Sequence, residues 1–297
     1  IERKDRRSTV NTDAETGLER AMKLLISDLD GTLYPRKESL NPHQREENFK
    51  AVKRWVDRGH QFAVATARGL HHYPAIREAL GFDVHFIGGN GAAVRLVNGE
   101  TIIKQLPCSV YIDLCRFVRD QDLNVSVTTG YHNQWIWSHN DRYPRGVAAY
   151  DGIWDSIEIA NLEEMNPEDG VERIQIFVPP HQRDAFRETL AQRNYPGIIT
   201  TSDQDMIDIG PLNSSKGISI SELCQRYNIG QDDLIVVGDS ENDIPMFKTT
   251  PHSYCIDLAE PRVIQSASHS VASVQELIDN LLEEELSEFN FSGQSAE

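Results

Sequence analysis

The chain has 297 residues, of which 39% are hydrophobic and 25% are charged, a composition that fits a globular protein of one large or two smaller domains. Its 29 basic and 46 acidic residues give a net charge of −17, which argues against nonspecific binding to nucleic acid or anionic lipid. The sequence contains neither a long apolar run nor a secretory signal, so we expect no membrane span and a cytoplasmic location. No C-x-x-C pair occurs, and we expect the cysteines to be reduced structural thiols.

The first 21 residues are polar and show no sustained hydrophobic period. We expect them to be an added or disordered leader outside the fold, because Met22-Lys23 stands directly before the first predicted strand. The apolar run Leu24–Ile26 predicts this buried strand, over Leu24–Ser27. A helix is expected to follow, with Asn41 as its N-cap and Pro42 at its first position, and to end at Gly59.

Apolar strands alternate with helices over much of the chain. Runs at 62–65, 84–87 and 234–237 predict strands, and a helix between the first two is expected to end at Gly81. Parallel strands need crossover connections and are covered on both faces. The pattern therefore predicts an α/β fold, with a Rossmann-like parallel sheet and helices on both of its faces.

The pattern changes after residue 88. Residues 92–105 predict a β-hairpin with a tight primed turn at Asn98-Gly99, and a helix near 109–120 should follow. Further short strands are expected near 125–128, 135–137 and 174–178. The predicted division is a core of residues 22–87 and 196–282, an inserted α+β cap of residues 88–195, and an acidic flexible tail of residues 283–297.

Two aspartates stand at the end of the first predicted strand, in Asp28-Leu29-Asp30-Gly31-Thr32. Alternate side chains of an extended strand share a face, so Asp28 and Asp30 can converge there, and Gly31 allows a sharp turn. Asp28 is suited to attack phosphorus and form an aspartyl-phosphate, with Asp30 as the general acid and then the general base. The alternative is a surface turn after a strand, where Asp-Gly is common.

Two further segments could hold the oxygens of a phosphate. Thr66 stands at a strand-to-helix turn, where a hydroxyl and backbone N–H groups can bind an anion. Its alternative role is that of an N-cap. Lys216 precedes an amphipathic helix and could screen a nucleophile from the charge of the phosphate. Its alternative role is that of a solvated lysine in a first helical turn. For Thr66 and Lys216 alike, the alternative is the commoner role when the residue is considered alone.

A fourth segment, residues 238–243, follows the apolar run 234–237 and reads Gly-Asp-Ser-Glu-Asn-Asp. Carboxylates at one sheet edge repel each other unless a cation binds them, and Mg²⁺ prefers oxygen ligands and substrate phosphate. For Asp243 the alternative is a carboxylate stabilised by a helix dipole. The expected metal ligands are Asp28, Asp239 and the backbone carbonyl of Asp30, with Asn242 and Asp243 in support, directly or through water.

The four segments together resemble the motifs of the haloacid dehalogenase-like superfamily of aspartate-nucleophile phosphatases. Residues 28–33 match the first motif, Thr66 the second, Lys216 the third and residues 238–243 the fourth. The long insertion between the second and third motifs is similar to the class IIB caps of this superfamily. The stretches 86–92 and 244–247 resemble Cof-type members.

The resemblance implies Mg²⁺-dependent hydrolysis of small phosphate esters, often sugar phosphates. An acid at Asp30 suits phosphatases and phosphomutases, because dehalogenases lack one at this place. Ala67 departs from the Cof-type pattern, which usually has glycine there, and a negative φ would tolerate the change. For Asn90 the alternative is a turn residue between two glycines. The phosphate- and substrate-binding residues implied are Thr66, Ala67, Asn90, Gly91 and Lys216.

Aromatic and basic residues gather in the predicted cap, where a lid could use them for specificity. Trp135 and Trp137 share a face of a strand and could stack on a sugar or ring, although packing within the cap is the commoner role. Arg142 and Arg145 could meet a second anionic group or be solvated surface charges. The whole cluster is His132, Trp135, Trp137, Arg142, Tyr143, Arg145, Tyr150 and Trp154.

The sequence therefore predicts a cytoplasmic, Mg²⁺-dependent phosphatase that acts on a small phosphorylated metabolite. One alternative is a phosphomutase of the phosphomannomutase type, which must keep its phosphoenzyme from water. The other is a non-enzymatic regulator that binds a phosphorylated ligand on the same scaffold. No nucleic-acid or membrane partner is expected, and the chain is expected to be a monomer or a weak homodimer.

Overall fold

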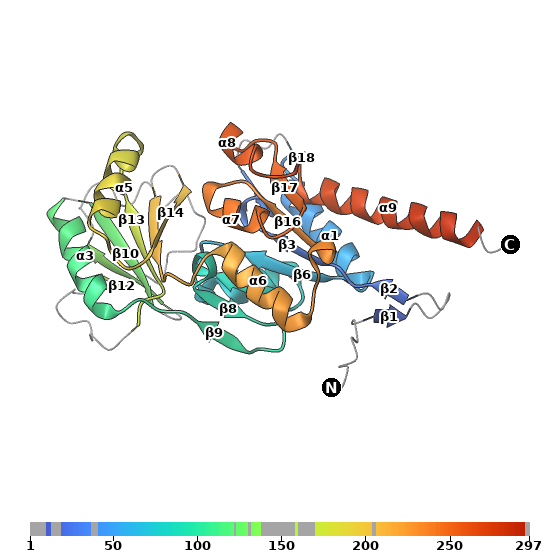
Figure 1. Cartoon of the computed structure of the whole chain (residues 1–297), viewed down its shortest axis with the longest axis horizontal. Helices are drawn as coiled ribbons and strands as arrows, with labels where there is room; N and C mark the ends of the chain where they lie inside the picture. The colour runs from blue at the N-terminus through green and yellow to red at the C-terminus, as the bar shows by residue number, and fades with distance from the viewer. Residues whose placement is uncertain are drawn as a thin grey trace, which may run out of the picture. The chain divides into compact units, whose positions relative to one another are not determined.

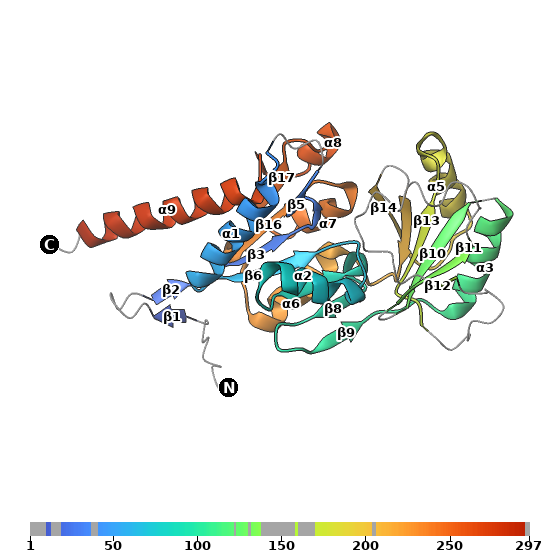
Figure 2. The same cartoon turned by 180° about the vertical axis from the view of Figure 1, so that it is seen from behind.

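Figures 1 and 2 show the computed structural model of the chain from opposite sides. The structure describes residues 10–12, 19–36, 41–121, 123–129, 132–137, 158–159, 170–203 and 206–294. Contacts between Cα atoms divide the chain into two compact units, residues 1–64, 220–239 and 246–297 in the first and residues 65–219 and 240–245 in the second. Within the described ranges, no helix has the length and apolar character needed to cross a membrane.

Five neighbouring strands of an eight-stranded sheet form the centre of the fold, and all pairs among these five are parallel. The buried runs in β3 and β16 are continuous, as expected for strands covered on both faces. The predicted α/β fold is therefore confirmed. In the order of the sheet, the strands are β18 (His269–Val271), β17 (His252–Ile256), β16 (Leu234–Gly238), β3 (Leu24–Ser27) and β6 (Gln61–Ala65).

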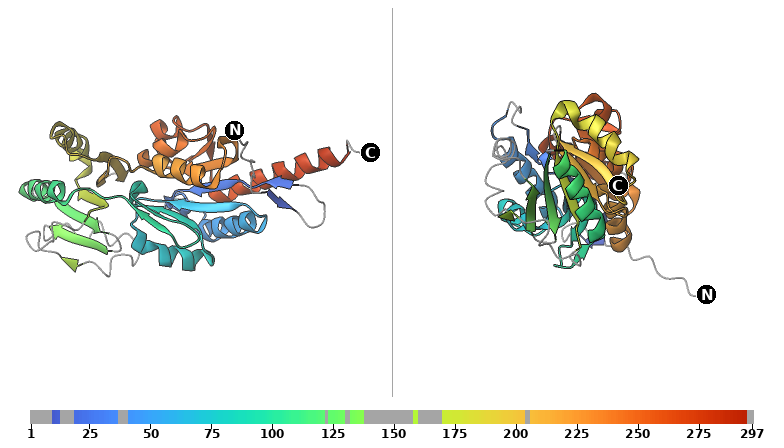
Figure 3. Two further views of the ribbon diagram at one scale, coloured as in Figure 1. Left: turned by 60° about the horizontal axis from the view of Figure 1, so that its bottom comes forward. Right: turned by 90° about the vertical axis from the view of Figure 1, so that its left-hand side faces the viewer.

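Helices lie on both faces of this sheet (Figure 3). Among them, α1 (Gln44–Asp57) packs against α9 (Val274–Gln294) and buries Ala51, Val52 and Trp55. Further helices are α2 (Tyr73–Leu80), α6 (Lys216–Tyr227), α7 (Ile244–Phe247) and α8 (Pro261–Ile264).

Three predictions for the first unit need correction. Helix α1 begins at Gln44 rather than after Asn41, because the Asn41 side chain accepts a hydrogen bond from the His43 N–H at 2.9 Å and closes a turn before the helix. The predicted flexible tail is helical as far as Gln294, and Glu285 on α9 lies 3.2 Å from the ring Nε2 of His60. Within the predicted leader, β1 (Val10–Thr12) pairs antiparallel with β2 (Glu19–Ala21), so its described part is a hairpin.

The predicted hairpin after residue 92 is present, but its turn is different. Strands β8 (Ala93–Arg95) and β9 (Thr101–Ile103) are antiparallel, and β7 (His85–Gly88) pairs with β8. A primed turn over Asn98-Gly99 needs positive φ at Asn98, its first central residue, but of the two residues only Gly99 has a positive φ, at +91°. The loop instead spans three residues, with the Leu96 N–H donating to the Glu100 carbonyl at 2.8 Å.

A second, six-stranded sheet lies wholly in the second unit, and helices α3 (Cys108–Asp120) and α5 (Arg183–Gln192) accompany it. The rings of Phe117 and Phe186 stack at 5.8 Å and join the two helices. In order, the strands are β12 (Glu158–Ile159), β11 (His132–Trp137), β10 (Asn124–Thr129), β13 (Arg173–Phe177), β15 (Met206–Gly210) and β14 (Ile198–Asp203).

The strand pairing differs from the predicted domain boundaries at both ends of the insertion. Strands β8 and β9 belong to the eight-stranded sheet order β18-β17-β16-β3-β6-β7-β8-β9, although the predicted cap began at residue 88. Strands β14 and β15 pair with each other and with β13, although the predicted core resumed at residue 196. Hydrogen bonding between strands therefore places residues 198–203 and 206–210 in the second sheet.

Candidate active site

Asp28 and Asp239 follow the neighbouring parallel strands β3 and β16, whose pairing runs from Leu24 with Leu234 to Ser27 with Val237. The Asp28 N–H continues this ladder by donating to the Val237 carbonyl at 2.8 Å. The two residues are 5% and 2% exposed. Adjacent parallel strands thus deliver both carboxylates to one edge of the sheet, as the sequence predicted.

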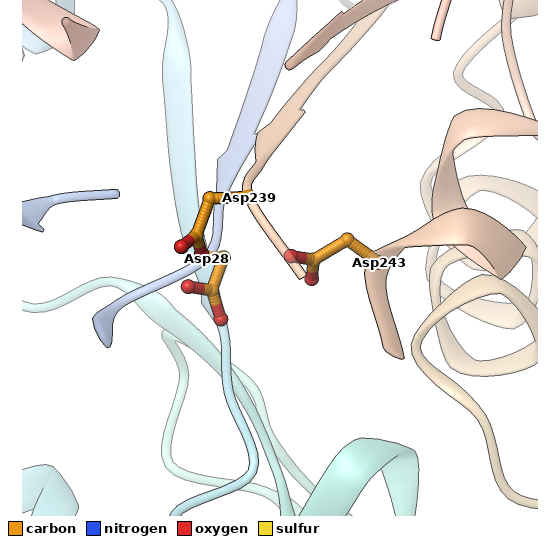
Figure 4. Close-up of side chains that lie close together, drawn as sticks. All are labelled: Asp28, Asp239 and Asp243. Atoms are coloured by element: carbon orange, nitrogen blue, oxygen red, sulfur yellow. The ribbon is translucent and has the colours of Figure 1, made fainter. Parts of the chain in front are cut away.

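Asp243 completes a group of three buried carboxylates. One oxygen from each of Asp28, Asp239 and Asp243 lies within 4.8 Å of the others (Figure 4). Three buried negative charges at this spacing repel each other strongly in a low-dielectric surrounding. Carboxylate oxygens are the ligands that a hard cation such as Mg²⁺ prefers, so the residues fit the predicted metal.

The segment after Asp28 turns back tightly beside Asp239. Asp30 is half-buried at the start of β4 (Asp30–Gly31), which pairs with β5 (Tyr34–Pro35). Gly31 has a φ of +95°, and a Cβ atom there would lie 2.2 Å from Oδ2 of Asp239. Glycine is therefore required at this position for both its backbone conformation and its size.

Two side chains from this segment hold the Asp239 carboxylate. The Thr32 hydroxyl donates to Oδ1 at 3.2 Å, and Arg36 donates from Nε and Nη2 to Oδ2 at 2.9 and 2.6 Å. The sequence analysis did not single out Arg36. Its only signal is a cation six residues beyond Asp30, which no local spacing rule connects with an acid at position 239.

Lys216 stands at the first position of α6, and its side chain is completely buried. Its Nζ donates to Oδ1 of Asp243 at 2.6 Å, and that side chain is completely buried as well. The alternative of a solvated lysine is therefore wrong. The other oxygen of Asp243 accepts a hydrogen bond from the Ser240 N–H at 2.9 Å in a capping box, so the predicted helix-terminal role of Asp243 is also present.

Thr66 follows β6 and is 1% exposed. Its hydroxyl oxygen accepts a hydrogen bond from the Arg68 N–H at 3.1 Å, which is the capping-type contact that the alternative reading expected. The carbonyl of Thr66 accepts from the Asn90 N–H at 3.0 Å, and the neighbouring carbonyl of Ala67 accepts from Nη1 of Arg173. The turn at Thr66-Ala67 is therefore held by hydrogen bonds from two other segments, through Asn90 and Arg173.

Asn90 is both a turn residue and a member of a buried polar network. Its φ is 55°, and its side chain donates to Asp208 at 3.2 Å and accepts from Nδ2 of Asn242 at 2.9 Å. The buried Oδ1 of Asn242 accepts no hydrogen bond from the described residues.

A pocket adjoins this network, lined by Gly89, Asn90, Arg173, Ile198, Thr200, Asp208, Gly210, Ser214, Ser215, Lys216, Asn242 and Pro245. Gly91 has a φ of +96°, and a Cβ atom there would lie 2.3 Å from the carbonyl oxygen of Ser215.

Arg173 and Asp208 were also missed by the sequence analysis. Both are nearly inaccessible, on β13 and β15, and Nη1 of Arg173 lies 3.6 Å from Oδ1 of Asp208. Burial lowers the pKa of Arg173, while Asp208 and Glu172 act in the opposite direction. Arg173 and Asp208 each stand next to an isoleucine, in strands where polar and apolar residues alternate. A charged residue inside such a strand is costly to bury, and this is the sequence signal that could have identified both residues.

The predicted cap residues are only partly described. Trp135 and Trp137 lie in β11, as their strand pattern predicted, and His132 is the first residue of that strand. The roles of these three side chains stay predictions. Arg142, Tyr143, Arg145, Tyr150 and Trp154 lie outside the described residues.

Two proteins of similar sequence are named as phosphatases. A Bacillus subtilis 5-amino-6-(5-phospho-D-ribitylamino)uracil phosphatase is 24% identical over 298 residues, covering 88% of this chain and 98% of that protein. An Enterobacter HMP-PP phosphatase is 24% identical over 254 residues, covering 83% and 88%.

Solved structures show the same fold. The HAD subclass IIB sugar phosphatase BT4131 has a TM-score of 0.72 at 18% identity, covering 88% of this chain and 98% of its own. A haloacid dehalogenase-like hydrolase from Bacteroides thetaiotaomicron has a TM-score of 0.73 at 20% identity, covering 88% and 99%. A family model described as haloacid dehalogenase-like hydrolase matches residues 25–279. The chain therefore belongs to the haloacid dehalogenase-like hydrolase family, among its Cof-type phosphatases.

Proposed function

We propose that the protein is a Mg²⁺-dependent phosphatase that hydrolyses a small phosphate monoester, a sugar phosphate or a similar metabolite, through an aspartyl-phosphate. The observation that carries the proposal is the group of buried carboxylates of Asp28, Asp239 and Asp243, with the buried Lys216 ammonium 2.6 Å from Asp243. Four buried charged groups are costly to a fold that does not use them. The phosphatase names of the relatives support the reaction class.

In the proposed reaction, a carboxylate oxygen of Asp28 attacks phosphorus, and the bond from phosphorus to the ester oxygen breaks. Asp30 gives its proton to the departing alkoxide, which leaves as an alcohol. Asp30 then takes a proton from a water molecule that attacks the aspartyl-phosphate, and inorganic phosphate and free Asp28 result. The hydrolysis is thus divided into two displacements: Asp28 is the nucleophile of the first, and Asp30 activates the water of the second.

The metal would be held by Asp28, Asp239 and Asp243 together with the carbonyl of Asp30, and Asn242 would support it through water. A bound Mg²⁺ supplies charge neutralisation for the carboxylates and the phosphoryl oxygens. We assign the phosphoryl oxygens to the side chains and N–H groups of the segments that the sequence singled out, namely Thr66, Ala67, Asn90, Gly91 and Lys216.

We place the substrate beyond the phosphoryl group in the pocket that Arg173, Asn242 and Thr200 help to line. Amide, guanidinium and hydroxyl groups of this kind suit a hydroxylated, polar leaving group. We propose that the module built on the six-stranded sheet serves as the cap. We also propose that the protein works in the cytoplasm on a small-molecule ester, as a monomer or weak homodimer.

The proposal is tested by phosphate release from a panel of sugar phosphates and other phosphate monoesters, with Mg²⁺ and with EDTA. We expect Mg²⁺-dependent turnover that Asp28→Asn and Asp239→Asn abolish, while the exposed Asp57→Asn serves as a matched control. Turnover that survives in Asp28→Asn would refute the assigned nucleophile. Conversion of a hexose 1-phosphate to its 6-phosphate would favour the mutase, and ligand binding without turnover would favour the regulator.

A further inference from the structure

We propose that Arg36 is an internal counter-ion of Asp239 that a divalent cation must displace, so that Arg36 sets the metal affinity of the site. The inference rests on the proposed metal site and deepens it. It assigns a role to a residue outside the four motif segments, and it concerns how strongly the site holds its cation.

The geometry places the guanidinium directly on a proposed metal ligand. Nε and Nη2 of Arg36 both donate to Oδ2 of Asp239, at 2.9 and 2.6 Å, while the Thr32 hydroxyl donates to Oδ1 at 3.2 Å. Both carboxylate oxygens are therefore engaged by donors from the segment that follows Asp28. The carboxylate itself is 1% exposed, so these partners replace most of its hydration.

A metal ion and Arg36 would neutralise the same charge at the same atom. Two positive groups that share one carboxylate oxygen repel each other, and the repulsion is strong where water is excluded. Mg²⁺ also demands close, nearly octahedral oxygen contacts, which an oxygen already accepting two N–H bonds cannot supply at full strength. The cation therefore binds at the expense of the Arg36 contact.

Arg36 can leave without a rearrangement of the core. Its side chain is 36% exposed, in contrast to Asp239, and it follows the short strand β5 rather than lying within the main sheet. A long arginine side chain can move its charged end into water while its stem stays in place. Displacement thus exchanges one partner of Asp239 for another and leaves β3 and β16 unchanged.

A nearby arginine provides a matched control. The Arg45 guanidinium lies 3.9 Å from the ring centroid of Tyr34 and 5.5 Å from that of Phe49. Arg45→Gln removes one positive charge, as Arg36→Gln does, but the contact that it removes is with aromatic rings. A general change in net charge affects both variants equally, whereas relief of competition for Asp239 affects only Arg36→Gln.

The test is a Mn²⁺ titration of the full chain without substrate, followed by calorimetry or by the electron paramagnetic resonance of free Mn²⁺. We expect Arg36→Gln to bind Mn²⁺ about tenfold more tightly than the wild type, a change that corresponds to one strong charge contact. Arg45→Gln should stay close to the wild type. Arg36→Lys should fall between them, because an ammonium cannot make the paired contact.

Urea unfolding gives a second readout. In EDTA, Arg36→Gln should unfold at lower urea than the wild type, and saturating Mg²⁺ should remove most of that difference. Equal or weaker Mn²⁺ binding by Arg36→Gln, or equal tightening by Arg45→Gln, would overturn the role of Arg36. If neither the wild type nor Arg36→Gln binds Mn²⁺, the metal site fails, and with it both the inference and the proposed metal dependence of the reaction.

Discussion

Lys216 and Asp243 form an ion pair with 2.6 Å between Nζ and Oδ1, and both side chains are completely inaccessible to solvent. The first stands at the start of α6, and the second ends the turn after β16, so the pair ties the third and fourth motifs together. A buried pair of this kind contributes little net stability, but removing one partner leaves a buried charge uncompensated.

Lys216→Met should therefore lower the free energy of unfolding by about 3–5 kcal/mol in the absence of metal. Asp243→Asn in the same background should recover part of that loss, because the unpaired charge is then gone. Urea unfolding of the two single variants and the double variant measures the coupling. A loss below about 1 kcal/mol for Lys216→Met would mean that the ammonium does not compensate Asp243.

Gly31→Ala should disturb Asp239 directly. The added Cβ atom would lie 2.2 Å from Oδ2 and 2.7 Å from Cγ of Asp239, at a backbone φ of +95°. We expect a loss of stability larger than the roughly 1–3 kcal/mol of backbone strain alone, together with weakened Mn²⁺ binding.

Gly99→Ala separates these two effects. Gly99 has nearly the same φ, +91°, but the nearest atom to an added Cβ, Nη1 of Arg95, lies 3.8 Å away. This variant should show the strain without the loss of metal binding. If Gly31→Ala and Gly99→Ala have equal effects on both the stability and the Mn²⁺ affinity, the close approach of Gly31 to Asp239 is contradicted.

Two buried histidines should make the fold sensitive to acid. Burial lowers the pKa of His85 from 6.5 to about 4 and, with help from His71, Arg68 and Arg173, the pKa of His72 to about 2. The unfolded chain takes up these protons first as the pH falls. The stability that the neutral rings contribute is therefore complete above pH 6.5 and is lost progressively below it, towards each folded pKa.

Between about pH 7.5 and about pH 5, each of these groups should account for a loss of roughly 2 kcal/mol. His85→Asn can still accept the hydrogen bond that the Val97 N–H donates to Nδ1 at 3.3 Å. In urea unfolding at both pH values, this variant should lose less stability on acidification than the wild type. If His85→Asn and the wild type lose the same stability between the two pH values, His85 is not held neutral in the folded protein.

Much of the fold follows from local patterns. The runs at 24–26, 62–65 and 234–237 are apolar throughout, and they became adjacent parallel strands because only a sheet covered on both faces buries them completely. The carboxyl ends of such strands meet at one edge, so the convergence of Asp28 and Asp239 could be predicted from the sequence.

Other features depend on partners that no local pattern reveals. Arg36 and Asp239 are separated by 203 positions, and nothing near Arg36 indicates its acid. The acidic residues after 283 are typical of a frayed end. Glu285 is nevertheless held by two partners, since its Oε2 lies 3.2 Å from Nε2 of His60 and its Oε1 lies 3.4 Å from Nζ of Lys23. The strands at 198–203 and 206–210 carry a pattern that fits either sheet, and only the pairing of β15 with β13 decides between the two sheets.

The most direct test of the account is a single-turnover reaction with an accepted phosphate ester, quenched in acid and analysed by mass spectrometry of the peptides. The account predicts a phosphoryl group on the peptide that contains Asp28, formed only with a divalent cation and absent from Asp28→Asn. Reduction of the quenched sample with borohydride should convert Asp28 to homoserine. Full turnover with no modified Asp28 at any time, or a phosphoryl group on another residue, would contradict it.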